Sequence, residues 1–178
     1  GVGTFAVQIA KSFGAEVTGV CSTRNVDLVR SIGADHVIDY THEDFTQGGQ
    51  RFDLIFELAG SNSPSEIRRA LTSKGTLVLI GHGESEGRWI GPFGRMIRAL
   101  VLSRFVSQRI TSYTGRPNYS SGPNKGDLAT LRELIEAGKI TPVIDRKYSL
   151  SETPEAIRYL EEGHARGKVV IAASGEGA

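Results

Sequence analysis

The sequence predicts an α/β protein built around a parallel sheet with helices on both faces. Its first three-quarters alternates between helical patterns and short apolar strands, among them Leu54–Leu58 and Thr76–Ile80. Continuous apolar strands are typical of a parallel sheet that is covered on both sides. A glycine turn also opens directly into a helix at Gly3. Together these patterns predict a three-layer, doubly wound sheet of the Rossmann type.

Helices and strands alternate through the first half of the chain. We expect helices over residues 3–13, 26–32 and 64–71 and strands over residues 16–21, 36–39, 54–58 and 76–80. The apolar face of the first helix is expected to consist of Phe5, Ile9, Ala10 and Phe13. Ser63-Pro-Ser-Glu66 matches a capping box for the third helix. Gly75 is expected to break the chain before the strand over 76–80.

The second half is less regular. We expect a helix over 93–102, a strand over 109–113 and a linker over 116–126. A helix over 128–137, an extended segment over 142–148, a helix capped by Thr153-Pro154 that runs to Glu162, and a strand over 168–173 come after the linker. Near the C-terminus a pair of strands thus flanks one helix, so these strands need a sheet of their own to pair in.

Composition excludes several classes of function. Among 178 residues, 21 Lys and Arg oppose 20 Asp and Glu, so no bulk charge favours nucleic acid or a membrane. The single cysteine, Cys21, excludes an intrachain disulfide, and the four histidines lack the spacing of metal ligands. There is no long apolar span and no signal peptide. We therefore expect a cytoplasmic protein without a metal site, although a targeting segment removed upstream would leave no trace here.

The turn Gly1-Val2-Gly3, followed at once by a helix, has the features of a dinucleotide site. Glycine lets the backbone approach a pyrophosphate, and a helix N-terminus offers unpaired N–H groups with a partial positive charge. A plain turn has the same sequence, so the interpretation depends on the order of the elements after the turn. A helix, a glycine, a strand and a polar cluster come next, in the order that a dinucleotide site requires.

The polar cluster Ser22-Thr23-Arg24-Asn25 follows the strand over 16–21. In a Rossmann unit this position faces the adenosine ribose. No carboxylate occurs there before Asp27, whereas Ser22, Thr23 and Arg24 offer donors to a 2′-phosphate. The cluster therefore predicts NADP(H) rather than NAD. The structural alternative, in which these residues only cap the next helix, stays open.

Six segments make the chain resemble the medium-chain dehydrogenase/reductase superfamily. They cover residues 1–15, 31–40, 52–60, 75–81, 136–145 and 163–171. Within that superfamily the chain is similar to the zinc-independent branch of quinone oxidoreductases. The resemblance implies a parent enzyme that transfers hydride from NADPH to a quinone, an enone or a similar activated carbonyl. Such a transfer needs mainly a well-placed cofactor, so no catalytic residue has to be assigned.

The resemblance also implies roles for individual residues. Gly1, Val2 and Gly3 would form the pyrophosphate turn, and Ser22, Arg24 and Asn25 would meet the 2′-phosphate. Tyr40 would lie near the adenine, with packing at a strand end as the alternative. Lys168 would reach the cofactor, with a plain surface position as the alternative. The residues expected near the nicotinamide follow strand ends: Ala59, Gly60, Gly81, His82, Ser112, Tyr113 and Thr114, with an exposed loop position as the alternative for His82.

In this family a first strand and a substrate-binding domain precede the glycine turn. The resemblance therefore implies a sheet that lacks its first strand, an NADP-binding domain over 1–138, and a C-terminal segment over 139–178 that normally packs with the substrate domain. The small-molecule substrate would bind through that absent domain, and a homodimer stays open. We expect the isolated chain to bind cofactor weakly and to be inactive or nearly so.

Two other functions remain open. One is a non-catalytic module that senses a nucleotide or binds RNA or a protein partner. A local basic face for RNA would consist of Arg88, Arg95, Arg98, Arg104 and Arg109, although the near-neutral net charge argues against it. The other is a zinc-dependent alcohol dehydrogenase of the same superfamily, because its metal ligands would lie upstream.

Overall fold

The computed structural model describes residues 1–58, 62–80, 107–112 and 125–173. They belong to two compact units. The first unit comprises residues 1–41 and 124–178, and the second unit comprises residues 42–123. The helix expected over 93–102 and most of the linker expected over 116–126 lie outside the described residues. The division expected at residue 138 stays a prediction.

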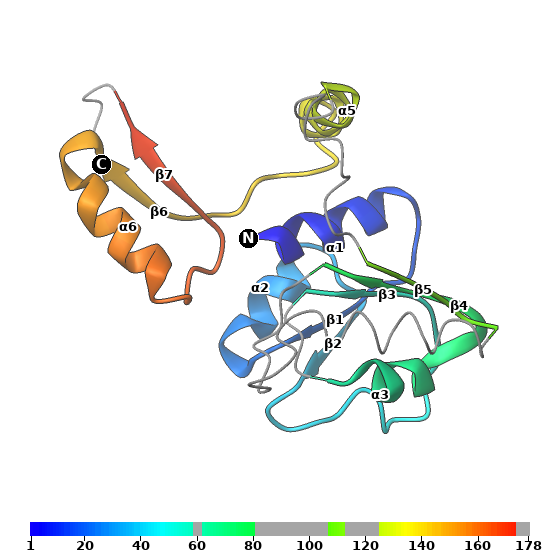
Figure 1. The fold of residues 1–178 in the computed structure, drawn as a ribbon. Coiled ribbons are helices and arrows are strands. Elements are labelled where there is room, and N and C mark those ends of the chain that lie inside the picture. Colours follow the sequence, from blue (N-terminus) through cyan, green and yellow to red (C-terminus); the bar gives the residue numbers. More distant parts are fainter. Residues whose placement is uncertain (59–61, 81–106, 113–124, 174–178) are drawn as a thin grey trace. The chain divides into compact units, whose positions relative to one another are not determined.

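The first unit begins with a helix and two parallel strands. Helix α1 covers Val2–Ser12, strand β1 covers Thr18–Cys21 and strand β2 covers His36–Asp39. A short 3₁₀ turn, η1 (Thr23–Asn25), leads from β1 into helix α2 (Val26–Ser31). β1 and β2 pair in register over their whole length and lie side by side in Figure 1. The carboxyl ends of both strands therefore meet at one edge.

Gly19, which is buried in β1, explains how α2 packs on this pair of strands. A Cβ at residue 19 would collide with the side chain of Val29 in α2. Glycine in a strand often marks a close approach of this kind. The absence of a side chain at Gly19 lets α2 lie directly against β1, which fixes the position of η1 between them.

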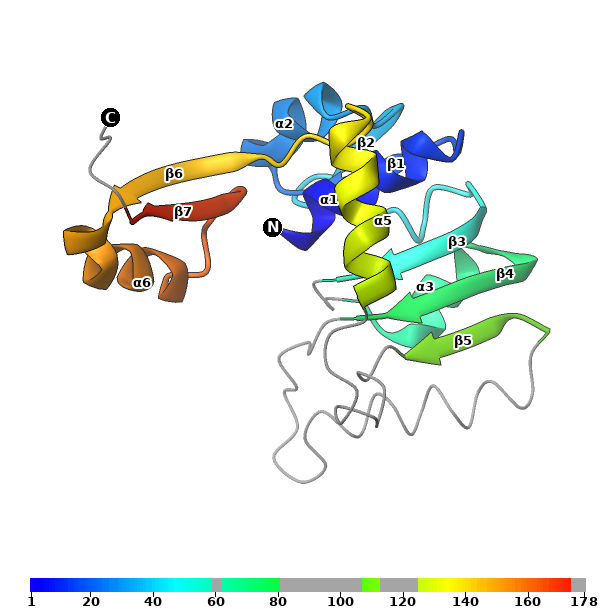
Figure 2. The same ribbon diagram turned by 90° about the horizontal axis from the view of Figure 1, so that it is seen from above.

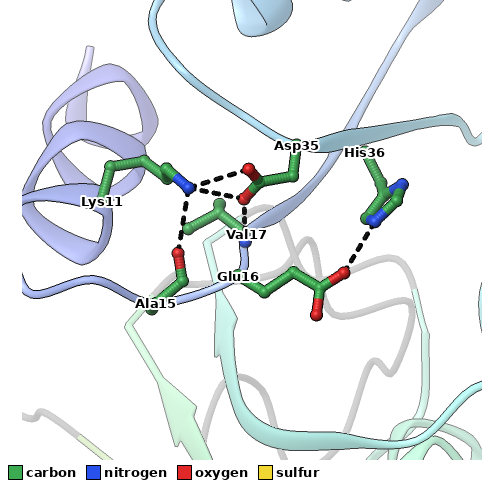
Figure 3. Close-up of polar contacts among 6 residues, drawn as sticks. All are labelled: Lys11, Ala15, Glu16, Val17, Asp35 and His36. Carbon is green, nitrogen blue, oxygen red and sulfur yellow. Dashed lines mark hydrogen bonds and ion pairs between the residues drawn. The ribbon is translucent and has the colours of Figure 1, made fainter.

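A polar clamp ties the end of α1 to the start of both strands. The Nζ atom of Lys11 lies 2.8 Å from each carboxylate oxygen of Asp35. The same carboxylate accepts the Val17 N–H at 2.7 Å. Figure 3 shows this clamp, with Nε2 of His36 2.8 Å from Oε1 of Glu16 beside it. The Lys11 hydrogen bond, followed by that of Val17, lowers the pKa of Asp35.

The C-terminal segment completes the first unit. Helix α5 covers Lys125–Glu136, strand β6 covers Ile144–Ser149, and the 3₁₀ turn η3 covers Leu150–Glu152. Helix α6 (Thr153–Glu161) and strand β7 (Lys168–Ala172) follow. β6 and β7 pair in parallel as a two-stranded sheet, so the separate sheet expected for these strands is confirmed. Figure 2 shows both strands with α6 next to them.

The second unit is a three-stranded parallel sheet. Its strands are β3 (Phe52–Glu57), β4 (Leu71–Leu79) and β5 (Arg109–Ser112), in that order across the sheet. Helix α3 (Pro64–Arg69) connects β3 to β4. With parallel strands and helical crossovers in both units, the α/β fold of the Rossmann type is confirmed.

The core of the second unit is apolar. Ile67 of α3 and Leu77 of β4 are fully buried, and Leu71 is 3% exposed. Partly buried apolar side chains pack around these three, namely Phe45, Ile55, Leu79 and Ile110. The core therefore lies between α3 and one face of the sheet.

The start of β4 corrects the sequence-based expectation. The strand begins at Leu71 and passes through Gly75, which was expected to break the chain. Pairing with β3 shifts register, because Phe52 lies opposite Leu71 whereas Leu54 lies opposite Thr76. A Cβ on Gly75 would lie 3.0 Å from the Phe52 carbonyl oxygen. Glycine here permits a close approach within the sheet and does not end the strand.

The buried face of α1 also differs from the expectation. Thr4 and Gln8, each 8% exposed, are its buried residues, whereas Phe13 is 78% exposed. The other three expected members of that face are half-buried. Gln8 accepts the Thr141 N–H at 2.8 Å and donates to the Thr141 carbonyl at 3.0 Å. A polar residue is buried here because it ties α1 to the segment that precedes β6.

Capping residues are confirmed for α3 and corrected for α6. The Ser63 hydroxyl accepts the Glu66 N–H at 3.3 Å, and the Glu66 carboxylate accepts the Ser63 N–H at 2.8 Å. Thr153 does not cap α6, because Glu152 occupies the N-cap position. The Thr153 hydroxyl instead donates to the Leu150 carbonyl at 2.6 Å.

Candidate functional site

The first turn of α1 leaves its backbone N–H groups available. Gly1 occupies the N-cap position, provides no side-chain cap, and no acidic residue stands in the first turn. The Thr4 hydroxyl donates to the Gly1 carbonyl at 3.0 Å, which supports the turn without using an N–H. A helix start of this kind attracts an anion. The expected pyrophosphate turn, Gly1-Val2-Gly3, lies at this point.

The loop after β1 brings the expected 2′-phosphate residues together. Ser22 precedes η1, and the Asn25 amide donates to the Ser22 hydroxyl at 3.3 Å. Arg24 is exposed between them. The Tyr40 N–H donates to the Cys21 carbonyl at 3.0 Å, so Tyr40, which is 59% exposed, follows β2 beside this loop. The three residues expected at the 2′-phosphate and Tyr40, expected at the adenine, thus share the carboxyl edge of β1 and β2.

The loop between α6 and β7 reaches the same edge from a distant part of the sequence. The Nε–H of Arg166 donates to Oδ1 of Asn25 at 3.2 Å. Nη2 of Arg24 lies 3.4 Å from Nδ1 of His164. An amide and an imidazole are the partners in these bonds, so neither bond neutralises a guanidinium, which is always charged. We refer to Ser22, Arg24, Asn25, His164 and Arg166 as the basic cluster.

Lys168 extends this contact to the start of α1. Its Nζ lies 5.5 Å from the centroid of the Phe5 ring, in the first turn of that helix. The Lys168 N–H donates to the Val143 carbonyl at 2.7 Å. Residues 166–168 therefore lie next to both the loop after β1 and the turn where the pyrophosphate is expected. The role of Lys168 itself stays a prediction.

Arg166 and His164 are the members of the cluster that the sequence patterns did not indicate. They are separated from their partners by 141 and 140 residues, and no local pattern brings such positions together. The available signal was the basic character of His164-Ala-Arg-Gly-Lys168, within a segment that already resembled the family.

The second unit gathers its strand ends at one edge. Glu57 lies opposite Leu79, and Leu79 lies opposite Ser112. Residues that follow parallel strands leave the sheet on the same side, where ligands of open α/β sheets bind. The expected nicotinamide residues that lie outside the described residues are Ala59, Gly60, Gly81, His82, Tyr113 and Thr114.

Other candidate groups among the described residues give no further site. Burial, followed by the charge of Asp39, raises the pKa of the Cys21 thiol, and a neutral thiol is a poor nucleophile. In the part of the chain that the structure describes, no three His, Cys, Asp or Glu side chains lie together as a metal would require. Of the five arginines considered as a basic face, only Arg109 lies within the described ranges, where it is exposed.

Comparison with known proteins identifies the family. A family model described as zinc-binding dehydrogenase matches residues 32–171, well over half of the chain. The chain belongs to this family. Within it, the chain is a medium-chain dehydrogenase/reductase of the quinone-oxidoreductase-like kind, as the resemblance implied.

Relatives of this dehydrogenase family member are longer than the chain. The mitochondrial NAD(P)H oxidoreductase RTN4IP1 of Mus musculus is 36% identical over an alignment of 190 residues. The alignment covers 96% of this chain and 45% of that protein. The chloroplastic quinone-oxidoreductase QR1 of Triphysaria versicolor is 34% identical over 176 residues, 96% of this chain and 49% of that protein. The chain spans about half the length of the curated relatives it matches.

Solved structures show the same fold. The quinone oxidoreductase from Coxiella burnetii matches with a TM-score of 0.73 and 28% identity, over 98% of this chain and 50% of that one. An NAD-dependent alcohol dehydrogenase matches with a TM-score of 0.71 and 25% identity, over 98% and 48%. These matches agree with the Rossmann-type topology.

The compartment stays a prediction for this family member. Among the described helices, none combines the length and the apolar character that a bilayer span requires. The names of the mouse and plant relatives assign them to mitochondria and chloroplasts. The cytoplasmic location expected from composition therefore has no support from these relatives.

Proposed function

We propose that this chain is the NADP(H)-binding part of an oxidoreductase that transfers hydride from NADPH to a quinone, an enone or a similar activated carbonyl. Family membership and the names of the relatives support an oxidoreductase that uses a nicotinamide cofactor. The choice of NADP over NAD depends on the basic cluster, and the acceptor would be held by a segment outside this chain.

The observation that carries the proposal is the convergence of two arginines on one loop. Arg24 comes from the loop after β1 and Arg166 from the loop before β7, and each bonds to a member of the opposite loop. A 2′-phosphate is a dianion with acceptor oxygens, and guanidinium forks match such a group well. Ser22 and Asn25 add neutral donors at the same edge. The donor set therefore fits a 2′-phosphate.

The remaining groups fit the rest of a dinucleotide. The first turn of α1 would hold the pyrophosphate through its N–H groups, with Lys168 next to that turn. The exposed ring of Tyr40 would meet the adenine. When bound, the nicotinamide would supply the hydride, and the residues of this chain would bind and orient the cofactor. No acid–base residue is assigned.

A fluorescence titration of the full-length protein with NADPH and NADH tests the proposal. We expect NADPH to bind at least about tenfold more tightly, because a guanidinium bond to phosphate contributes on the order of 1.5–3 kcal/mol. Equal affinities for the two cofactors would refute the NADP assignment while leaving the family assignment intact.

Two matched substitutions locate the effect. Arg24→Gln should weaken NADPH binding by about tenfold or more and leave NADH binding unchanged, because only NADPH has the 2′-phosphate. Arg132→Gln removes an equally charged side chain from α5, where Arg132 pairs with Glu136 at 3.4 Å. This control should change neither affinity. A loss of NADH affinity in Arg24→Gln would indicate a general defect instead.

A zinc-dependent alcohol dehydrogenase is a second candidate for the whole protein. The family description names zinc, and one structural match is titled an NAD-dependent alcohol dehydrogenase. Metal analysis of the full-length protein by atomic emission decides between the two. Stoichiometric zinc together with alcohol oxidation would favour the second candidate.

A further inference from the structure

Asp145, in the first half of β6, holds the loop that carries Arg166. Its Oδ2 atom accepts the Tyr159 hydroxyl at 2.7 Å and the Arg166 N–H at 2.8 Å. Tyr159 belongs to α6 and Arg166 to the loop before β7. One carboxylate oxygen thus joins three segments of the chain.

Further contacts surround this junction. The Arg146 guanidinium stacks over the Tyr159 ring at 3.8 Å from its centroid, which fixes the ring that donates to Asp145. On the other side of Arg166, Gly167 is buried so close to Val143 that a Cβ would collide with its carbonyl oxygen. The backbone of Arg166 is therefore held from both sides, while its side chain extends to Asn25.

Ionisation at the junction agrees with this geometry. The hydrogen bond from Tyr159 lowers the pKa of Asp145, and the Arg166 N–H lowers it further. The same bond raises the pKa of Tyr159. Asp145 is consequently an ionised acceptor at neutral pH, and charge-assisted bonds of this kind are stronger than neutral ones.

We propose that Asp145 is a positioning residue for cofactor selectivity, because it places the Arg166 guanidinium where a 2′-phosphate would bind. Asp145 acts on the site through Arg166, whose backbone N–H donates to the Oδ2 atom of Asp145. This inference rests on the proposed NADP(H) function.

Positioning and simple charge predict opposite results. The Asp145 carboxylate is negative, so through space it repels a phosphate, and its removal alone would tighten NADPH binding. If Asp145 acts by positioning, its removal frees the loop, Arg166 leaves the site, and NADPH binding weakens. Asp145→Asn separates the two effects, because its amide oxygen still accepts both bonds whereas its charge is gone.

The experiment compares NADPH and NADH affinities in the full-length protein. We expect Asp145→Ala to weaken NADPH binding by about five- to tenfold with NADH unchanged, as for loss of one guanidinium bond to an anion. Asp145→Asn should restore most of the selectivity. Tyr159→Phe, which removes one hydroxyl and is compatible with the fold, should reduce selectivity in the same direction and by a smaller factor.

Asp44→Ala is the matched control. Asp44, in the second unit, also uses one carboxylate oxygen to accept two bonds, from the N–H and the hydroxyl of Thr46 at 2.9 and 2.8 Å. Its loss should lower thermal stability without changing the ratio of the two affinities.

Three results would overturn the inference. They are tighter NADPH binding in Asp145→Ala, an equal loss for both cofactors, and unchanged selectivity in Asp145→Ala and Tyr159→Phe. A wild-type protein without any preference for NADPH would refute the proposed function and the inference together. A wild-type preference that both variants retain would refute the inference alone.

Discussion

Each of the two units of this chain is stabilised internally by a different kind of contact. In the second unit, Ile67 and Leu77 are fully buried and their neighbours are apolar. In the first unit, the buried residues of α1 are Thr4 and Gln8, and polar pairs such as Lys11–Asp35 join its segments. Apolar side chains are also buried in the C-terminal segment of this unit, namely Ile140, Tyr148 and Ala156.

This difference agrees with the expected contributions of the two units, a stable core from the second unit and precisely placed loops from the first. Apolar burial is non-directional and stabilises a fold without fixing individual atoms closely. Hydrogen bonds require particular distances and angles, so they define where a loop lies. The basic cluster belongs to the unit whose loops are placed by hydrogen bonds. We therefore expect substitutions in the apolar core of the second unit to reduce stability, and substitutions of the hydrogen-bonded residues of the first unit to affect cofactor binding as well.

Leu77→Ala should have the largest effect. Leu77 is 0% exposed, so its truncation leaves a cavity that destabilises the protein by about 2–5 kcal/mol. Urea unfolding followed by circular dichroism measures this change. Leu128→Ala is the control, because Leu128 on α5 is 55% exposed and should cost no more than about 0.5 kcal/mol. Equal losses would mean that the second unit does not depend on its apolar core.

Gly19→Ala should come next and should affect both stability and binding. The new Cβ meets Val29 of α2, and overpacking of this kind costs about 1–3 kcal/mol. Because η1 lies between β1 and α2, displacement of α2 should also weaken NADPH binding. The double variant Gly19→Ala with Val29→Ala removes the collision and should recover some of both losses. A double variant no better than Gly19→Ala would contradict this explanation.

Gln8→Ala should cost about 1–3 kcal/mol, because it leaves the polar backbone groups of Thr141 without a partner. The local test is amide hydrogen exchange, since the Thr141 N–H should exchange faster while amides in β4 keep their protection. Gln8→Glu retains the acceptor for the Thr141 N–H, so it should protect that amide better than Gln8→Ala does. Uniformly faster amide exchange in both units would contradict a local role of the Gln8–Thr141 hydrogen bonds.

The smallest effect should come from Asp35→Asn and should depend on pH. The folded-state pKa of Asp35 is lowered from about 3.8 by Lys11 and Val17, so the unfolded chain binds more protons at acid pH. The stability that Asp35 contributes is therefore present above about pH 4 and is lost as the pH falls through the lower folded value. Thermal unfolding of both proteins at several pH values should show a wild-type advantage at neutral pH that disappears in acid. A difference in stability between the two proteins that stays the same at every pH would contradict a contribution of the Asp35 carboxylate.

Local patterns predicted the secondary structure well where one physical cause dominates. The strand His36–Asp39 matches its expected bounds, and the capping box at Ser63 starts α3 as expected. Gly75 was misjudged because glycine serves both to break a strand and to permit close contact, and only the position of Phe52 decides between these roles.

Of the candidate site, only the residues that are neighbours in the sequence could be predicted. Ser22, Arg24 and Asn25 are neighbours in the sequence. Their donor groups indicated Ser22 and Arg24, and the resemblance to the family added Asn25. Arg166 needs Asp145 and Asn25 to be placed, and those contacts exist only after folding. The polar character of Gln8 and Thr4 likewise hid their burial, because hydrophobic periodicity does not detect a side chain buried for its hydrogen bonds.

The contact between Arg166 and Asn25 also has a practical consequence for redesigning this protein. If the protein prefers NADP(H) as proposed, an exchange of residues 22–25 alone would leave the guanidinium of Arg166 in place. Exchange of residues 22–25 alone should then give a protein that binds NADPH and NADH with similar affinities. The two loops would have to be exchanged as a pair, together with a residue at position 145 suited to the new loop.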